Sequence, residues 1–294
     1  MHLRRTMMFV PGNQPGLLND ASLYGADVLI FDLEDSVALT EKDAARTLLA
    51  YALPKLDWGQ AELMVRVNDL DGPFGLEDLE AVIKAGAKII RLPKADNAEQ
   101  VKNYDQIIGK IEAELNLPIN SIEMLAAIES AQGVLNAKEI AAASPRLMGL
   151  ALGAEDFTAD LGVSRSKSGE ELLLARQMIV LAAKAQGIDA YDTVYSQIDD
   201  LEGLAEETKR AKALGFRGKS VLHPNQIEVV HQVFAPSQEE IAQAQRLLAA
   251  VEEAKVRGSG VISLDGAMVD RPVILRAERI IHMAKSLNIL KGEA

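Results

Sequence analysis

Several acidic side chains stand directly after apolar runs of the sequence, where they could bind a divalent cation. Glu129 ends the run "EMLAAIE", Asp156 follows "LMGLAL" in "GAED", and Glu34 and Asp35 follow "DVLIFD" with one residue between. Carboxylates gathered at one place repel one another unless a cation is present. Mg²⁺ prefers oxygen ligands and takes only one or two protein carboxylates. These positions therefore indicate a magnesium site.

Basic and other polar side chains end further apolar runs. Arg66 lies in "VRVND", and Arg91 and Lys94 lie in "RLPK". Each has an ordinary structural explanation when taken singly, because an arginine could form an ion pair between strands and an acid such as Glu129 could cap the next helix. The number of such positions argues instead for one polar site. The other candidates of this kind are Asp32, Asn68, Glu155, Asp192, Tyr195 and His223.

Eight short apolar runs alternate with segments of helical periodicity. Continuous apolar runs are typical of parallel strands buried on both faces. Eight strand–helix repeats predict a (β/α)8 TIM barrel over residues 1–235, and the missing G-x-G-x-x-G and P-loop patterns disfavour a nucleotide-binding open sheet. The runs are "MMFV", "DVLIF", "ELMVRV", "AKIIRL", "SIEMLAAI", "RLMGLAL", "DAYDTVY" and "GKSVLH". Helices are expected over residues 15–24, 41–53, 75–86, 98–115, 132–143, 170–186, 201–214 and 225–234.

The barrel gives the acidic positions a common location. In such a barrel the carboxyl ends of the strands face the active site. Glu129 and Asp156 would end neighbouring strands, which lie about 5 Å apart, so both side chains can bind one ion. We therefore predict that Glu129 and Asp156 hold Mg²⁺, and that Glu34 and Asp35 hold metal-bound water instead.

Residues 236–294 are predicted to form a C-terminal extension of helix, short strand and helix. The first helix follows a Ser cap signal, and the last, "RPVILRAERIIHMAKSL", starts with a proline near its first position. The extension is too small for a large core of its own. We expect it to pack on the barrel or on a neighbouring subunit.

The composition excludes several classes of protein. The chain has no cysteine, which rules out disulfides, thiolate metal sites and a cysteine nucleophile. A net charge of −12 argues against nucleic-acid binding, which needs clustered basic residues. No apolar run approaches the roughly 20 residues that span a bilayer, and the first residues lack the apolar core of a signal peptide. The sequence thus predicts a cytoplasmic protein that binds neither nucleic acid nor a membrane.

One family shares a set of stretches with this sequence, in the same order and over nearly the whole chain. They are "RRTMMFVPGN", "ADVLIFDLEDSVALTEKDAAR", "VRVND", "GLEDLEAV", "RLPKAD", "LAAIESAQGV", "GLALGAEDF", "YDTVYS", "GFRGKSVLHPNQI" and "LDGAMVDRPVI". Short pieces such as "RLPK" are weak signals, but the set is specific. On these stretches the sequence resembles the citrate lyase β-subunit family, the citryl thioester lyases, within the HpcH/HpaI aldolase/citrate lyase group.

The resemblance implies a (β/α)8 barrel, commonly assembled as a trimer, that binds Mg²⁺ through Glu129 and Asp156. It implies that Arg66 and Glu129 contact the substrate. It also implies that Arg66 is catalytic together with Asp270, the acid of the "MVD" motif, which can reach a neighbouring subunit's site. Asp270 could instead only cap the last helix, before Pro272. The implied partners are other lyase subunits and an acyl carrier protein with a phosphopantetheine-type arm, or a CoA thioester.

The implied reaction cleaves a citryl thioester to oxaloacetate and an acetyl thioester by retro-Claisen chemistry. Mg²⁺ would stabilise the substrate alkoxide, and Arg66 would stabilise the thioester enolate. Asp270, with a raised pKa, would protonate the enolate carbon. An acidic carrier would have to dock on this acidic chain, so we expect a positive rim at the barrel mouth. Its predicted members are Arg4, Arg5, Lys94 and Lys219.

The sequence leaves alternatives open. A malyl-CoA or citramalyl-CoA lyase or thioesterase would use the same metal site and Asp270. A pyruvate aldolase of the same superfamily is disfavoured, since it needs a histidine near the early strand ends and the only histidines are His2, His223, His231 and His282. A non-catalytic scaffold subunit of a lyase complex would not need the complete set of site residues.

Overall fold

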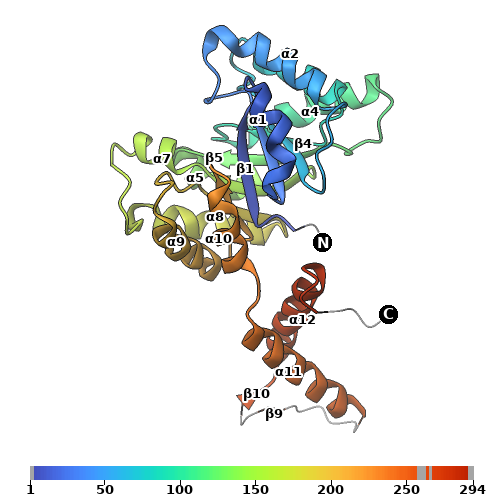
Figure 1. The fold of residues 1–294 in the computed structure, drawn as a ribbon, viewed down its shortest axis with the longest axis vertical. Helices are drawn as coiled ribbons and strands as arrows, with labels where there is room; N and C mark the ends of the chain where they lie inside the picture. Colours follow the sequence, from blue (N-terminus) through green and yellow to red (C-terminus); the bar gives the residue numbers. More distant parts are fainter. Residues whose placement is uncertain (1–2, 257–262, 265–266, 291–294) are drawn as a thin grey trace. The chain divides into compact units, whose positions relative to one another are not determined.

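The computed structural model describes residues 3–256, 263–264 and 267–290, and contains a closed barrel of eight parallel strands (Figure 1). The strands follow one another around the barrel in chain order, and β8 pairs with β1. Each of the eight predicted apolar runs overlaps one strand, so the predicted (β/α)8 TIM barrel is confirmed. The strands are β1 (Thr6–Pro11), β2 (Val28–Asp32), β3 (Glu62–Arg66), β4 (Ile89–Leu92), β5 (Glu123–Ile128), β6 (Leu147–Leu152), β7 (Asp189–Asp192) and β8 (Gly218–Val221).

Helices connect the strands, and most match the predicted ranges. The predicted helix over 132–143 is divided at Asn136, whose side-chain Nδ2 donates a hydrogen bond to the Asp96 carbonyl at 2.7 Å. Helix α7, formed by "AEDFTAD", was not predicted. The helices are α1 (Pro15–Asp20), α2 (Lys42–Ala52), α3 (Gly75–Lys84), α4 (Ala98–Glu114), α5 (Ala131–Leu135), α6 (Ala137–Ala141), α7 (Ala154–Asp160), α8 (Leu173–Ala185), α9 (Leu201–Leu214) and α10 (Asn225–Phe234), with 3₁₀ turns η1 (Ala21–Tyr24), η2 (Leu39–Glu41) and η3 (Glu170–Leu172).

Alternate side chains of each strand point into the barrel, because side chains along a strand change face at every residue. The interior cluster of buried residues includes Met64, Ile89 and Leu125 from three neighbouring strands. Burying each such side chain stabilises the fold by about 1.5–3 kcal/mol. Two residues further on, the same face carries Arg66 after Met64 and Arg91 after Ile89. The apolar core and the polar mouth are therefore successive layers of one interior.

The chain divides into two compact units, and the boundary lies within α10. One unit is Arg4–His231, which contains the barrel; the other is formed mainly by the chain from Gln232 onward. The second unit contains α11 (Gln238–Val256), β9 (Ser263–Leu264), β10 (Ala267–Met268) and α12 (Arg271–Ser286). Its buried side chains come from α11 and α12 and include Leu247, Val251 and Ala277. The predicted extension began at residue 236, four residues after this boundary.

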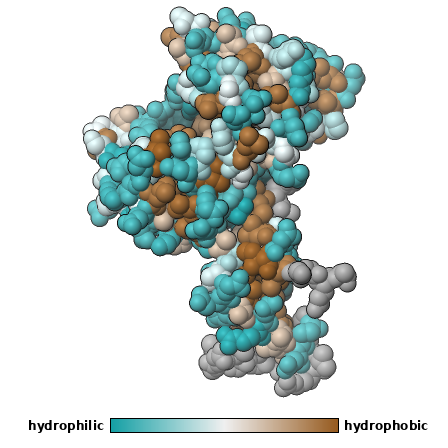
Figure 2. Space-filling model, in the orientation of Figure 1, coloured by the Kyte–Doolittle hydropathy of each residue, from teal (hydrophilic) through white to brown (hydrophobic). Residues whose placement is uncertain are grey.

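The surface of the barrel unit is mixed in character. Figure 2 shows hydrophilic side chains over most of the visible face of this unit, with apolar side chains between them. Exposed apolar residues scattered among polar ones are a normal part of the surface of a folded protein. Among the helices that the structure describes, none is long and apolar enough to cross a membrane.

Candidate active site

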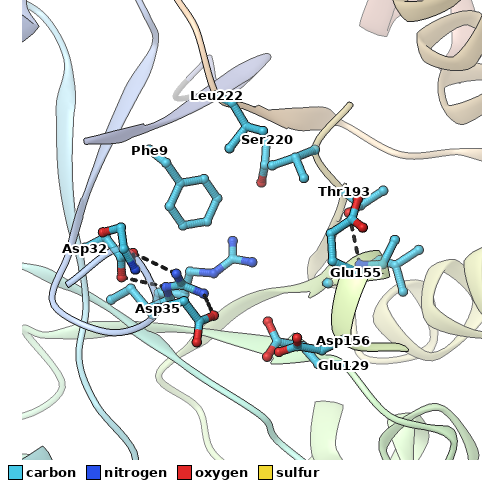
Figure 3. A pocket seen from close by; sticks show the side chains of 16 residues that line it. Phe9, Asp32, Asp35, Glu129, Glu155, Asp156, Thr193, Ser220 and Leu222 are labelled. Carbon is cyan, nitrogen blue, oxygen red and sulfur yellow. Dashed lines mark hydrogen bonds and ion pairs between the residues drawn. The ribbon is translucent and has the colours of Figure 1, made fainter. Parts of the chain in front are cut away.

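A cavity opens where the carboxyl ends of the strands meet, and it has a volume of about 190 Å³, room for a small organic acid. Its walls come from the ends of all eight strands and from loops that follow them (Figure 3). In Figure 3 Glu129 and Asp156 lie on one side, with Asp32 and Asp35 on the other. The lining residues are Phe9, Asp32, Asp35, Ser36, Arg66, Arg91, Glu129, Leu152, Gly153, Ala154, Glu155, Asp156, Thr193, Val194, Ser220 and Leu222.

Arg66 is surrounded by carboxylates. Its Nε and Nη2 each donate to one oxygen of Asp32 at 2.7 Å, and its Nη1 lies 2.9 Å from Glu34 and 3.1 Å from Asp35. Burial would lower the pKa of Arg66, but the hydrogen bonds and charges of these acids raise it above its ordinary value. The guanidinium is therefore always charged, and most of its donors are already used.

Glu34 and Asp35 connect this cluster to Lys94. The Lys94 Nζ lies 2.9 Å from Glu34, 3.8 Å from Asp35 and 3.9 Å from Asp156. The hydrogen bond to Glu34 raises the pKa of Lys94 to about 12. The predicted role of Glu34 and Asp35 in holding metal-bound water stays a prediction. Their carboxylates do lie on the path from Arg66 to the predicted metal pair.

Glu129 is a buried carboxylate with an unused oxygen. Only 5% of the residue is exposed, and its Oε2 has no hydrogen-bond partner among the described residues. The alternative role of Glu129, as a cap of the next helix, is wrong. Ser130 caps α5 through its Oγ, which accepts a hydrogen bond from the Gly133 N–H at 2.9 Å. A Cβ on Gly153 would lie 2.5 Å from Glu129 Oε1, so glycine is required for this side chain to fit.

Glu129 and Asp156 fit a hard divalent cation. They follow β5 and β6, which pair with Ile128 opposite Leu152. Burial raises the pKa of Glu129 to about 7, even though the charges of Arg91 and Arg66 oppose the rise. A carboxylate in this state lacks a close counter-charge, which a cation would supply. No three acidic or histidine side chains in the described residues form a metal-binding group, so a cation here would keep positions for water or substrate.

Arg91 is the residue to which sequence reasoning gave no role. It is fully buried and lines the cavity, and its Nε and Nη1 have no hydrogen-bond partner in the described part of the chain. The suggested ion pair between strands is therefore wrong for Arg91. Burial lowers its pKa to about 10, so it remains charged at neutral pH. The alternation of side chains along β4 could have predicted that Arg91 faces the cavity, because Arg91 follows the interior residue Ile89 by two and lies opposite Arg66 on β3.

Phe9 separates the two guanidinium groups from the apolar core. The Arg66 and Arg91 Cζ atoms lie 5.0 and 5.2 Å from the centre of the Phe9 ring. Both distances are within the range of a cation–π interaction. Ser220, on β8, also lines the cavity, and its buried Oγ has no partner among the described residues. Sequence reasoning named neither Phe9 nor Ser220.

The predicted positive rim is wrong for three of its four residues. Arg4 pairs with Glu62 and Glu123, and Arg5 pairs with Asp27 at 2.8 Å. These acids precede or begin strands, so both arginines lie at the opposite end of the barrel. Lys219 is fully buried. Lys94 is the one predicted member at the mouth.

A buried ion network supports the mouth behind β7 and β8. The Lys219 Nζ contacts Asp192 at 2.9 Å, and the Thr193 carbonyl and Glu207 at 2.7 Å each. Arg176 donates to Asp192 at 2.8 Å. The nearby charges of Lys219 and Arg176 lower the pKa of Asp192 although burial opposes this. Asp192, predicted as a mouth residue, is therefore a support beneath it.

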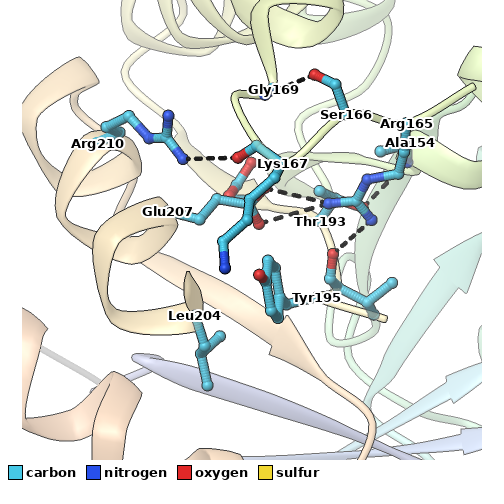
Figure 4. Close-up of polar contacts among 12 residues, drawn as sticks. Ala154, Arg165, Ser166, Lys167, Gly169, Thr193, Tyr195, Leu204, Glu207 and Arg210 are labelled. Atoms are coloured by element: carbon cyan, nitrogen blue, oxygen red, sulfur yellow. Dashed lines mark hydrogen bonds and ion pairs between the residues drawn. The ribbon is translucent and has the colours of Figure 1, made fainter. Parts of the chain in front are cut away.

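Two further candidates are Glu155, in the first turn of α7, and Tyr195, in the loop after β7, which Figure 4 shows near Arg165 and Glu207. Arg165 donates to Glu155 at 2.7 Å and to the Val194 carbonyl at 2.9 Å, and lies 3.2 Å from Glu207. Tyr195 donates its hydroxyl hydrogen to Asp200 at 2.8 Å. Glu155 thus ties α7 to Arg165, and Tyr195 ties the loop after β7 to the start of α9. His223 is exposed and pairs with Asn225 at 2.8 Å.

Asp270 lies in the second unit, at the start of α12. It is exposed, and its Oδ1 accepts a hydrogen bond from the Val273 N–H at 3.2 Å. The helix-cap function considered for Asp270 is therefore present. Its catalytic role stays a prediction.

A family model described as HpcH/HpaI aldolase/citrate lyase matches residues 5–224 of this chain. The chain belongs to this family. The citrate lyase subunit beta of Leuconostoc mesenteroides subsp. cremoris is 51% identical over 291 residues, which cover 99% of this chain and 96% of that protein. A (3S)-malyl-CoA thioesterase of Cereibacter sphaeroides is 37% identical over 286 residues, covering 97% and 96%.

A solved structure of the family is similar to this one. It is Mycobacterium tuberculosis CitE in complex with magnesium, acetoacetate and coenzyme A. The TM-score is 0.79 and the sequence identity 36%, with 95% of this chain and 97% of that chain covered. The family assignment made from the sequence is confirmed by these comparisons.

Proposed function

We propose that this protein is a Mg²⁺-dependent carbon–carbon lyase that cleaves a citryl thioester to oxaloacetate and an acetyl thioester. The observation that carries the proposal is the pair of carboxylates Glu129 and Asp156 beside two guanidinium groups, in the cavity of a citrate lyase family barrel. The 51% identity to a citrate lyase subunit beta supports this substrate over others. The CitE structure in complex with magnesium supports the choice of metal.

Glu129 and Asp156 would hold the cation. When bound, Mg²⁺ would supply positive charge to the oxygens of the hydroxy acid and so favour loss of the hydroxyl proton. Lys94, 3.9 Å from Asp156, keeps that carboxylate partly neutralised. Glu34 and Asp35 would orient water around the site.

The remaining roles belong to Arg66 and Asp270. Arg66 would contact the substrate and stabilise negative charge on the thioester oxygen as the enolate develops. The carboxylates of Asp32, Glu34 and Asp35 fix its guanidinium in place, which lowers the cost of orientation. Asp270 would give a proton to the enolate carbon. For this its carboxyl group would lie in the cavity of its own or of a neighbouring subunit.

The proposed setting follows from the same family. An acyl carrier protein with a phosphopantetheine-type arm, or CoA, would carry the thioester, and other lyase subunits would complete the complex. We propose a homotrimer in the cytoplasm. A malyl-CoA or citramalyl-CoA lyase or thioesterase is the second candidate, and the 37% identity to a malyl-CoA thioesterase favours it among the alternatives.

The decisive measurement is cleavage of citryl, malyl and citramalyl thioesters by the isolated protein with Mg²⁺. Release of oxaloacetate from the citryl thioester at the highest kcat/KM is expected. A preference for malyl or citramalyl thioesters would support the second candidate instead. No release from any thioester by the folded protein would favour a scaffold subunit.

Asp270→Asn tests the proposed acid. Turnover should be abolished, because the amide cannot donate the proton, while Mg²⁺ affinity measured by calorimetry stays nearly unchanged. The amide oxygen still accepts the hydrogen bond that caps α12, so folding should be kept. Full activity of this variant would exclude Asp270 as the acid.

A further inference from the structure

The buried polar atoms without partners in the described residues gather at one place. They belong to Asn13, Arg91, Glu129 and Ser220, and three of these four residues line the same cavity. A buried polar group without a partner destabilises the fold, typically by about 10-fold or more in the folding equilibrium. Such groups are found in folded proteins where a bound ligand supplies the missing hydrogen bonds. The cavity therefore has donors and acceptors left over for a polar ligand.

Arg91 is the unused cation among them. Arg66, opposite Arg91 in the strand register, directs its guanidinium at three carboxylates within 3.1 Å. Within the described chain no carboxylate forms an ion pair with Arg91, and its Nε and Nη1 make no hydrogen bond. Arg66 and Arg91, which are opposite each other in the strand register, thus differ in how far nearby carboxylates neutralise them. One is neutralised by the protein, and the other is left charged inside the cavity.

We propose that Arg91 binds a carboxylate of the substrate and selects a dicarboxylate oxo-acid half over a monocarboxylate one. This inference rests on the proposed function. The oxo acid's first carboxylate would lie with the cation held by Glu129 and Asp156. Its second carboxylate needs another positive partner, and the free guanidinium on the neighbouring strand β4 provides one. Arg91 is then a substrate-binding residue that determines specificity.

Oxaloacetate and pyruvate are matched probes for this role, because they differ by one carboxylate. Binding of each to the full-length protein with Mg²⁺ can be measured by calorimetry. Arg91→Met removes the charge and replaces the guanidinium by an unbranched apolar side chain. We expect it to weaken oxaloacetate binding by about 10- to 100-fold, the effect of losing hydrogen bonds to a charged group. Pyruvate binding should change by less than about 3-fold.

Arg146 provides the matched control. It is also buried, but it pairs with Asp105 and with both oxygens of Glu112 at 2.7 Å. Arg146→Met leaves Glu112 buried without its partner and should lower Tm by roughly 5 °C or more, with oxaloacetate affinity unchanged. Arg91→Met breaks no hydrogen bond to the described residues, so its Tm should fall by less than that of Arg146→Met. A fall in Tm as large as that of Arg146→Met would indicate a structural role for Arg91.

Three outcomes would overturn the proposal. They are wild-type affinity of Arg91→Met for oxaloacetate, an equal loss for oxaloacetate and pyruvate, and a drop in Tm like that of Arg146→Met. If Arg91→Met does not fold, Arg91→Lys is the second variant to measure. It keeps the charge and should retain part of the preference for oxaloacetate. Failure of wild-type protein to cleave any citryl thioester would count against the proposed function alone. Binding of the two acids tests Arg91 separately.

Discussion

Buried charges in the barrel unit are of two kinds. Some are closed in ion pairs: Arg5 with Asp27 and Arg146 with Glu112 at the amino-terminal end, and Lys219 with Asp192 beneath the mouth. Others, Arg91 and Glu129, line the cavity with atoms that have no partner among the described residues. A paired charge depends on its partner, so removing one member should lower stability. Removing an unpaired cavity charge should harm activity more than folding.

The largest effect is expected from breaking the paired network. Lys219→Met removes the shared partner of Asp192 and Glu207, both buried. The free energy of unfolding should fall by about 3–5 kcal/mol, because two acids are left buried with less counter-charge. Urea unfolding followed by circular dichroism measures it. Lys84→Met is the control: its pair with Glu80 is exposed, so a change within about 0.5 kcal/mol is expected.

Glu129→Gln, at the mouth, should lower activity and not stability. Activity should fall by about 10²- to 10³-fold, since an uncharged amide cannot hold the cation as the carboxylate would. The free energy of unfolding without metal should stay equal or rise. Glu123→Gln, at the other end of the same strand, is the control and should keep full activity. An active Glu129→Gln enzyme, or one that unfolds more easily, would remove the contrast between paired and unpaired buried charges.

Lowering the pH should remove the stability that the ion pair between Glu112 and Arg146 contributes. Burial would raise the pKa of Glu112, but hydrogen bonds from Arg146 and from backbone N–H groups lower it to about 2, from an ordinary value of 4.5. A lowered pKa gives stability that is present above pH 4.5 and is lost as the pH falls through about 2. The loss should be about 3 kcal/mol in all.

The Glu112→Gln variant isolates this contribution. It should be less stable than the wild type at pH 7, and the difference should shrink as the pH falls from 4.5 to 2. Thermal unfolding in a pH series provides the measurement. A difference that does not depend on pH would mean that Glu112 is not ionised in the folded protein.

The smallest effect is expected at Ser220. Its hydroxyl is buried, lines the cavity and has no partner in the described residues. Ser220→Ala should raise KM for the thioester by about 2- to 10-fold and leave stability equal or slightly higher. Ser144→Ala is the matched control, because the Ser144 Oγ accepts from the Arg146 N–H at 3.1 Å. The control should lose about 1 kcal/mol of stability and no activity.

The fold could be predicted from the sequence because barrel strands are buried on both faces. Continuous apolar runs such as "DVLIF" and "RLMGLAL" therefore marked every strand. Helix α7 was missed, since its residues "AEDFTAD" are too few for a periodic pattern and were interpreted as polar site residues. The break at Asn136 depends on a hydrogen bond to Asp96, a contact distant in sequence.

The site could be predicted only in part. Strand ends located Arg66, Glu129 and Asp156 correctly at the cavity. Arg4 and Arg5 could have been excluded, because residues that precede β1 lie at the opposite end from the mouth. The free state of Arg91 could not be predicted, since it depends on Asp32, Glu34 and Asp35 all contacting its neighbour.

The strand register that sets Arg66 opposite Arg91 has a consequence for how this cavity changes in evolution or in misfolding. A shift of β4 by one residue would turn Ile90 into the cavity and Arg91 toward the surrounding helices. The barrel could still close and keep its backbone hydrogen bonds, while the free positive charge would be lost. The positive charge of this cavity thus depends on the register between β3 and β4 as well as on the residue types. One deleted residue before β4 would erase it without altering any side chain.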